Sequence, residues 1–151
     1  MPVRIYKIKH EKGFTLVETI VVIAIVTVLT GAGLFVGLGN YQSYSLSMER
    51  SMVSSLLARA RGRALNNIGG EPHGLYIDAG GGKYVLFRGS VYNPLSSDNE
   101  EYDKEDAVDV SGLNEVVFYQ LTGDASIEGD IMLSVEGRTA TISINYEGRI
   151  N

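Results

Sequence analysis

Residues 13–39 of the chain read GFTLVETIVVIAIVTVLTGAGLFVGLG, and the only charged side chain among them is that of Glu18. The 21 residues from 19 to 39 carry no charge at all. A run of about 20 apolar residues is long enough to cross a bilayer as an α-helix. This stretch therefore predicts one membrane-spanning helix near the N-terminus.

The charges on either side of this stretch are unequal. Residues 1–13 hold four basic side chains against Glu11 alone, a net charge of +3, whereas the remainder holds 9 basic and 17 acidic residues, a net charge of −8. Basic residues beside a span stay in the cytoplasm, so we expect residues 1–13 inside and the rest outside. A negative surface repels phosphate groups, which disfavours nucleic acid as a partner. The basic residues of the leader are Arg4, Lys7, Lys9 and Lys12.

Three interpretations of the predicted membrane span differ in the role that they give to Glu18. A secretory signal has a shorter apolar core followed by small residues at its cleavage site, and this core is too long for that. A plain membrane anchor fits the hydropathy, although a charge at the bilayer centre costs on the order of 2.5–3.5 kcal/mol. A third interpretation pairs Glu18 with a positive group in a protein assembly. The α-amino group that cleavage before Phe14 would create is such a group.

The stretch GFTLVE at positions 13–18, with a basic leader before it and a long apolar run after it, resembles the type IV prepilin signature. The resemblance implies that a prepilin peptidase cuts between Gly13 and Phe14 and N-methylates Phe14. It also implies that Glu18 neutralises the terminal amine of a neighbouring subunit as a filament grows. The implied partners are this peptidase, other pilin or pseudopilin subunits, an inner-membrane assembly platform and membrane lipid.

The apolar segment departs from many major pilins of this family, which carry a proline midway along it. Here four glycines occupy the second half of the segment, and each lowers helix propensity by about 1 kcal/mol relative to alanine. One hypothesis is local melting of the helix over residues 31–39 in a filament. The other is a small-xxx-small face for close helix packing at Gly33 and Gly37. Both stay open for the set Gly31, Gly33, Gly37 and Gly39.

Beyond residue 40 the apolar residues recur at the spacing of one helical face. This spacing predicts a helix over residues 15–66 that ends before the Gly-Gly-Glu-Pro stop signal at 69–72. Arginines 59, 61 and 63 point in different directions on such a helix, so we expect salt bridges with the acidic head or with neighbouring subunits. The expected apolar face is Val53, Leu56, Leu57, Ala60, Ala64 and Ile68.

Residues 73–151 predict an antiparallel sheet, and a long helix lying on such a sheet gives an α+β pilin fold. Strands are expected at 73–79 and 83–88 around three glycines, at 116–121, and at 131–135 and 138–146 around the two-residue turn Glu136-Gly137. The expected domains are a removed leader (1–13), a helix (14–68, with 14–39 in the membrane) and a head (69–151). The predicted inward side chains are Leu75, Ile77, Ala79, Ala140, Ile142, Ile144 and Tyr146.

Two short stretches resemble one branch of the family, the H-type minor pseudopilins of type II secretion and the FimT-like minor pilins. They are LARARGRA at 57–64 and INYEGRI at 144–150. Some FimT-like proteins bind DNA through a Gly-Arg-x-Arg ending. The matching positions here are Gly148, Arg149, Ile150 and Asn151, so the second arginine is absent and DNA binding is disfavoured.

No catalytic, cofactor or metal site is expected. The acidic run DNEEYDKED at 98–106 could supply oxygen ligands to calcium, but it lacks the spacing of an EF-hand, which favours a solvated loop. The chain has no cysteine, and its two histidines, His10 and His73, are not part of any recognisable catalytic pattern.

The sequence thus predicts a structural subunit rather than an enzyme. We expect a minor pseudopilin or pilin of a type II secretion system or type IV pilus, held in the inner membrane and later moved into a periplasmic or cell-surface filament. The alternatives are the major subunit of a surface filament, or a simple membrane-anchored binding module in which Glu18 is incidental.

Overall fold

The computed structural model describes residues 13–151, apart from the side chains of residues 34–42. One helix, α1 (Leu16–Leu65), accounts for a third of the chain and agrees with the predicted helix to within one residue at each end. The chain divides into two units, Met1–Gly39 and Asn40–Asn151, and each is described by itself.

The N-terminal unit contains the apolar half of α1. Among the described residues, one helix is long and apolar enough to cross a membrane, with the window Leu16–Gly33 at a mean hydropathy of 2.2. None of that window is buried. The backbone is helical across all four glycines of the segment in this single chain.

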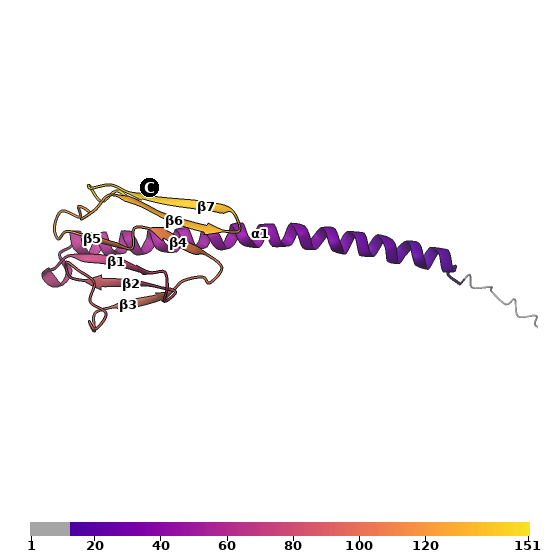
Figure 1. The fold of residues 1–151 in the computed structure, drawn as a ribbon, viewed down its shortest axis with the longest axis horizontal. Helices are drawn as coiled ribbons and strands as arrows, with labels where there is room; N and C mark the ends of the chain where they lie inside the picture. Colours follow the sequence, from indigo (N-terminus) through magenta and orange to yellow (C-terminus); the bar gives the residue numbers. More distant parts are fainter. Residues whose placement is uncertain (1–12) are drawn as a thin grey trace, which may run out of the picture. The chain divides into compact units, whose positions relative to one another are not determined.

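The predicted α+β class with antiparallel strands is confirmed, but the strands of the head form two sheets rather than one (Figure 1). The first has the order β3-β2-β1-β5 and the second the order β4-β6-β7. The first sheet consists of β1 (His73–Asp78), β2 (Lys83–Arg88), β3 (Glu100–Asp103) and β5 (Glu115–Phe118). The second consists of β4 (Asp109–Gly112), β6 (Gly129–Val135) and β7 (Arg138–Ile144).

Two predicted turns are confirmed, and both have a local cause. Between β1 and β2, the backbone N–H of Gly81 donates to Oδ1 of Asp78 at 2.8 Å, which holds the glycine-rich loop. Between β6 and β7, Glu136 and Gly137 have φ values of 47° and 79°. Two consecutive positive φ values are typical of a type I′ turn, whose twist matches that of the flanking strands.

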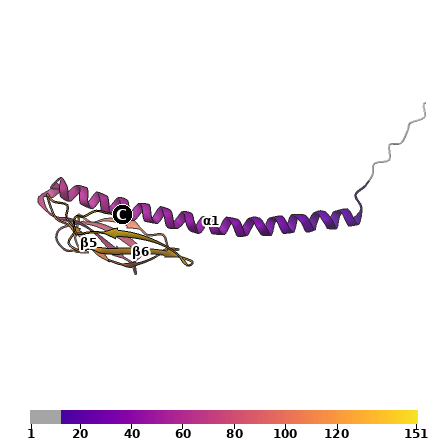
Figure 2. The ribbon, with the colours of Figure 1, turned by 90° about the horizontal axis from the view of Figure 1, so that it is seen from above.

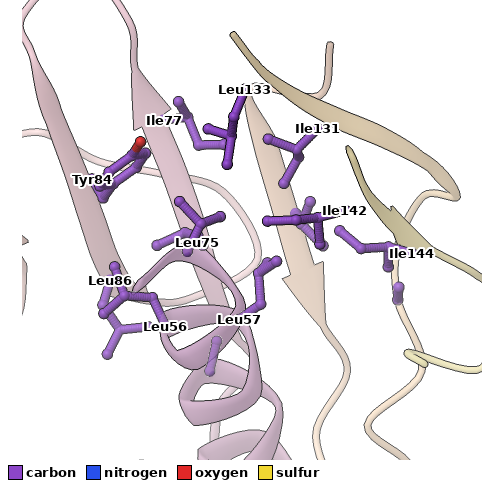
Figure 3. Packing of buried hydrophobic residues seen from close by; sticks show 14 of the residues in the cluster. Leu56, Leu57, Leu75, Ile77, Tyr84, Leu86, Ile131, Leu133, Ile142 and Ile144 are labelled. Atoms are coloured by element: carbon purple, nitrogen blue, oxygen red, sulfur yellow. The ribbon is translucent and has the colours of Figure 1, made fainter. Parts of the chain in front are cut away.

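The core forms where the C-terminal half of α1 lies along the sheets (Figure 2). Leu56 and Leu57 of the helix lie among Leu75 and Leu86 of the first sheet and Ile142 of the second (Figure 3). Fully burying one such side chain contributes about 1.5–3 kcal/mol. The predicted helical face is buried from residue 53 to residue 64 but not at 68, because α1 has already ended there.

Two further side chains predicted to point inward are exposed. Ala79 follows the last residue of β1 and lies in the hairpin loop, and Tyr146 lies two residues beyond the end of β7. The chain turns back at Gly148 (φ 71°), so that Ile150 pairs with Ile144 and the C-terminal residues cover the end of β7. A side chain at 148 would lie 2.1 Å from the carbonyl oxygen of Gly123, so this close turn requires glycine.

Candidate assembly site

The predicted cleavage site lies just before the first turn of α1. Gly13 and Phe14 are outside the helix, and Phe14 is 81% exposed. A Cβ atom added at Gly13 would meet nothing within 4 Å, so the described structure does not require glycine there. The rest of the predicted leader, residues 1–12, lies outside the described residues, and so do His10 and the four basic side chains.

Glu18 lies in the first turn of α1 with its side chain exposed. Its backbone N–H donates to Oγ1 of Thr15 at 3.2 Å, which makes Thr15 the N-cap of the helix. A carboxylate in this position is favoured by the helix dipole. Within the described residues this carboxylate forms no ion pair, so it is available to a positive group outside this part of the chain.

The glycines of the apolar segment have open surroundings where these are described. An added Cβ atom at Gly31 or Gly33 would meet nothing within 4 Å. Gly37 and Gly39 are helical, but their side-chain surroundings lie outside the described part of the structure. Nothing among the described residues therefore accounts for glycine at 31 and 33.

The arginines near the end of α1 bind the head, as predicted for two of the three. Arg59 and Arg63 form ion pairs with the carboxylate of Glu100 at 3.1 and 2.6 Å. Arg61 instead donates to the carbonyl oxygens of Gly123 and Glu147, at 3.1 and 2.9 Å. These contacts fix α1 to the head and leave no common basic patch.

The acidic run at 98–106 is not the predicted solvated loop. Its middle forms strand β3, which pairs with β2 from Lys83↔Asp103 to Leu86↔Glu100. Charged side chains on an edge strand protect it from pairing with other chains. Within the described residues, no group of three or more histidine, aspartate or glutamate side chains is placed to hold a metal ion.

Glu100 makes the attachment of α1 dependent on pH. Partial desolvation acts to raise the pKa of Glu100, but the hydrogen bonds from Arg63 and Tyr102 and the nearby arginine charges outweigh it and lower the pKa below its ordinary value. Because the unfolded state then binds more protons in acid, this stabilisation is present above about pH 4.5 and is lost as the pH falls through the native pKa.

We therefore expect Glu100→Gln to lower the free energy of unfolding at pH 7 by about 0.5–1 kcal/mol, a value limited by solvent screening of this half-exposed group. Denaturant unfolding at pH 7 and at pH 3 measures the effect, which should be smaller at pH 3. The matched control is Glu128→Gln, a change at an exposed residue that forms no ion pair with the described residues. Equal stability losses at both pH values would contradict a charge-based attachment.

The structure also buries polar side chains to which the sequence assigns no role, among them His73 and Glu49. His73 is 3% exposed, and its Nε2 lies 2.8 Å from the carbonyl oxygen of Ile68. Glu49 is 4% exposed and accepts a hydrogen bond from the hydroxyl of Tyr84 at 2.7 Å. The signal for Glu49 was its position on the buried helical face, four residues before Val53.

The comparisons with known proteins agree with this geometry. A family model described as the prokaryotic N-terminal methylation motif matches residues 8–34. The comparison with curated proteins finds no match. The chain therefore carries a prokaryotic N-terminal methylation motif at the start of its apolar helix and has a pilin-like α+β fold.

Solved structures with the same fold come from two minor subunits. The type IV minor pilin FimU of Pseudomonas aeruginosa (strain PAO1), in two crystal forms, gives TM-scores of 0.55 and 0.57 at 17% and 16% identity. These matches cover 70% and 73% of this chain and 90% and 89% of FimU. The minor pseudopilin EpsH of the type 2 secretion system of Vibrio cholerae gives a TM-score of 0.52 at 10% identity, over 71% of this chain and 94% of EpsH.

Proposed function

We propose that this chain is a minor subunit of a type IV pilus-like filament, serving a type II secretion system or a type IV pilus. The observation that carries the proposal is the methylation motif at the start of α1. The N-terminal part of this helix is apolar and exposed, and its C-terminal part packs in the core of the head. The likeness of the head to a minor pilin and a minor pseudopilin supports the choice of a minor subunit.

In this proposal a prepilin peptidase cuts between Gly13 and Phe14 and methylates the new amine of Phe14. The exposed position of this junction is compatible with access by an enzyme. Before assembly the chain crosses the inner membrane once, with residues 1–13 inside and the head outside. The mature chain then comprises the helix (14–68, with 14–39 apolar) and the head (69–151).

Assembly moves the apolar half of α1 from lipid into a bundle of equivalent helices. The exposed apolar side chains of residues 16–33 are covered by lipid before assembly and by neighbouring helices after it. The transfer therefore needs no refolding of the head. Glu18 pairs with the terminal amine of a neighbouring subunit. Because an unpaired charge is costly in an apolar bundle, this pair fixes the axial position of each new subunit.

The glycines of the apolar segment have one of two roles in the filament. The open space around Gly31 and Gly33 suits the close approach of a neighbouring helix. Local melting over residues 31–39 is the other proposal, and an unbroken helix across these residues in a filament map would contradict it.

The proposal of a minor subunit is tested by counting copies. We expect the processed chain to be present in sheared or purified filaments of the source cells at a few per cent or less of the main subunit, measured by quantitative mass spectrometry with isotope-labelled peptides of the head. Near-equimolar or greater abundance would make it the major subunit. Complete absence from filaments, with the chain still in the membrane, would favour a simple anchored binding module.

A further inference from the structure

A small cleft lies where the second half of α1 meets the loop after β3. It has a volume of about 210 Å³ and is lined by Tyr44, Ser45, Met48 and Glu49 of the helix and by Glu105 of the loop. None of these residues belongs to the N-terminal assembly site. Two of the five carry carboxylates, so the cleft is acidic.

The carboxylate of Glu49 is held in a fixed position at this cleft. Its Oε1 atom accepts hydrogen bonds from the hydroxyl of Tyr84 at 2.7 Å and from the backbone N–H of Glu105 at 3.2 Å. Burial, and then the hydrogen bond to Glu49 and its negative charge, raise the pKa of Tyr84, so its hydroxyl stays protonated and donates. Neither donor carries a positive charge, and Oε2 receives no hydrogen bond from the described residues.

The described residues form no salt bridge with this carboxylate. The nearest lysine in the loop, Lys104, directs its Nζ to the carbonyl oxygens of Val108 and Glu105 at 2.6 and 3.1 Å instead. Glu49 and Glu105 form no ion pair with the described residues. Burying a carboxylate that forms no ion pair with the described residues costs free energy, so the cleft favours a cation from outside this part of the chain.

The side chains at the rim of the cleft favour one chemical class of cation. Tyr44 and Met48 are 64% and 54% exposed, and they offer an aromatic face and a flexible apolar side chain beside the carboxylate. Methylene groups pack on such surfaces, and a cation is attracted to the face of a tyrosine ring. The described residues form no metal-binding group of three, which favours an organic cation on an aliphatic stem over a metal ion.

We propose that the cleft is a socket for an arginine or lysine side chain of a neighbouring pilin-like subunit. The guanidinium or ammonium group pairs with Oε2 of Glu49, and the aliphatic stem packs against Tyr44 and Met48. The identity of the partner as a subunit rests on the proposed function, whereas binding of the cation does not. The socket would add a head-level contact to the one made by the N-terminal helix.

The test uses the full chain, purified in detergent, with n-butylguanidinium chloride as the probe for an arginine side chain. We expect saturable binding with a dissociation constant in the millimolar range, followed by NMR shifts of methyl-labelled Met48. Glu49→Gln keeps the oxygen that Tyr84 and Glu105 bind but turns the outward oxygen into a donor, so it should weaken binding at least fivefold. Glu128→Gln, the same change on an exposed residue outside the cleft, should bind as the unaltered chain does.

Equal binding by the unaltered chain and Glu49→Gln, or saturation at the same concentration by butan-1-ol, would overturn the proposal. Circular dichroism checks that Glu49→Gln folds. If it does not fold, Tyr44→Ala is the second variant, because it removes an exposed side chain at the rim without changing the core. We then expect its affinity for n-butylguanidinium to fall at least twofold. An unchanged affinity would contradict the proposed socket. Because the probe is a small molecule, a failure to bind it would not contradict the proposal that the chain is a filament subunit. Conversely, a failure of processing or of filament incorporation would not affect the binding result.

Discussion

Replacing Gly13 with valine is expected to stop N-terminal processing while leaving the folded head unchanged. In the described structure nothing lies within 4 Å of a Cβ atom at this position, and the residue precedes the helix. Any effect must therefore arise in the enzyme that reads the junction, where a branched side chain would need space that glycine does not. We expect the processed fraction in cells that also express a prepilin peptidase to fall at least tenfold, measured by intact mass.

The matched control is Thr19→Val, which introduces the same side chain six residues later and leaves the Gly13-Phe14 junction intact. It should be processed as the unaltered chain is. Normal processing of Gly13→Val would show that the peptidase does not read this glycine, and a loss of head stability in the variant would contradict the open surroundings of Gly13.

Replacing Glu18 with glutamine is expected to allow processing but to prevent incorporation into filaments. Glutamine also suits the first turn of a helix that begins with a threonine cap, so α1 should start as before. What the change removes is the negative charge, and losing one partner of a desolvated ion pair costs about 2–5 kcal/mol. This corresponds to a decrease of roughly 30-fold or more in the ratio of incorporated to membrane-bound chain.

Immunoblots of sheared filaments and of membranes, made from the same cells, measure this ratio. Glu128→Gln, which removes a charge of the same sign from the surface of the head, should be incorporated normally. A normal ratio for Glu18→Gln would mean that Glu18 has no role in assembly and is only tolerated in a membrane anchor. A decrease of the ratio in both variants would indicate an effect of net charge rather than of Glu18.

The elements that the sequence predicts well are those with a local cause. The stripe from Val53 to Ala64 has helical spacing, and the helix ends where Asn67, Gly69 and Gly70 adopt positive φ values. At the Glu136-Gly137 turn, Gly137 is the residue that readily adopts a positive φ value. The N-terminal signature is also local, which is why the family model matches the same segment.

The elements that the sequence misses depend on contacts between distant residues. The mostly charged side chains of strand β3 predict a solvated loop. Its pairing with β2 and the ion pairs of Glu100 with α1 depend on residues far away in the sequence. Alternation along a strand shows that one face is buried but not which sheet the strand joins. For the same reason the acidic residue at 49, polar on an otherwise apolar face, gave no hint of its partner Tyr84.

Processing between Gly13 and Phe14 is tested most directly by the intact mass and N-terminal sequence of the unaltered chain after expression with a prepilin peptidase. We expect a product that begins at Phe14, with its amine methylated, and that is absent when the peptidase is omitted. A chain that still begins at residue 1 or 2 in the presence of an active peptidase would contradict this expectation, and would leave a membrane-anchored head whose acidic residue 18 has no assembly role.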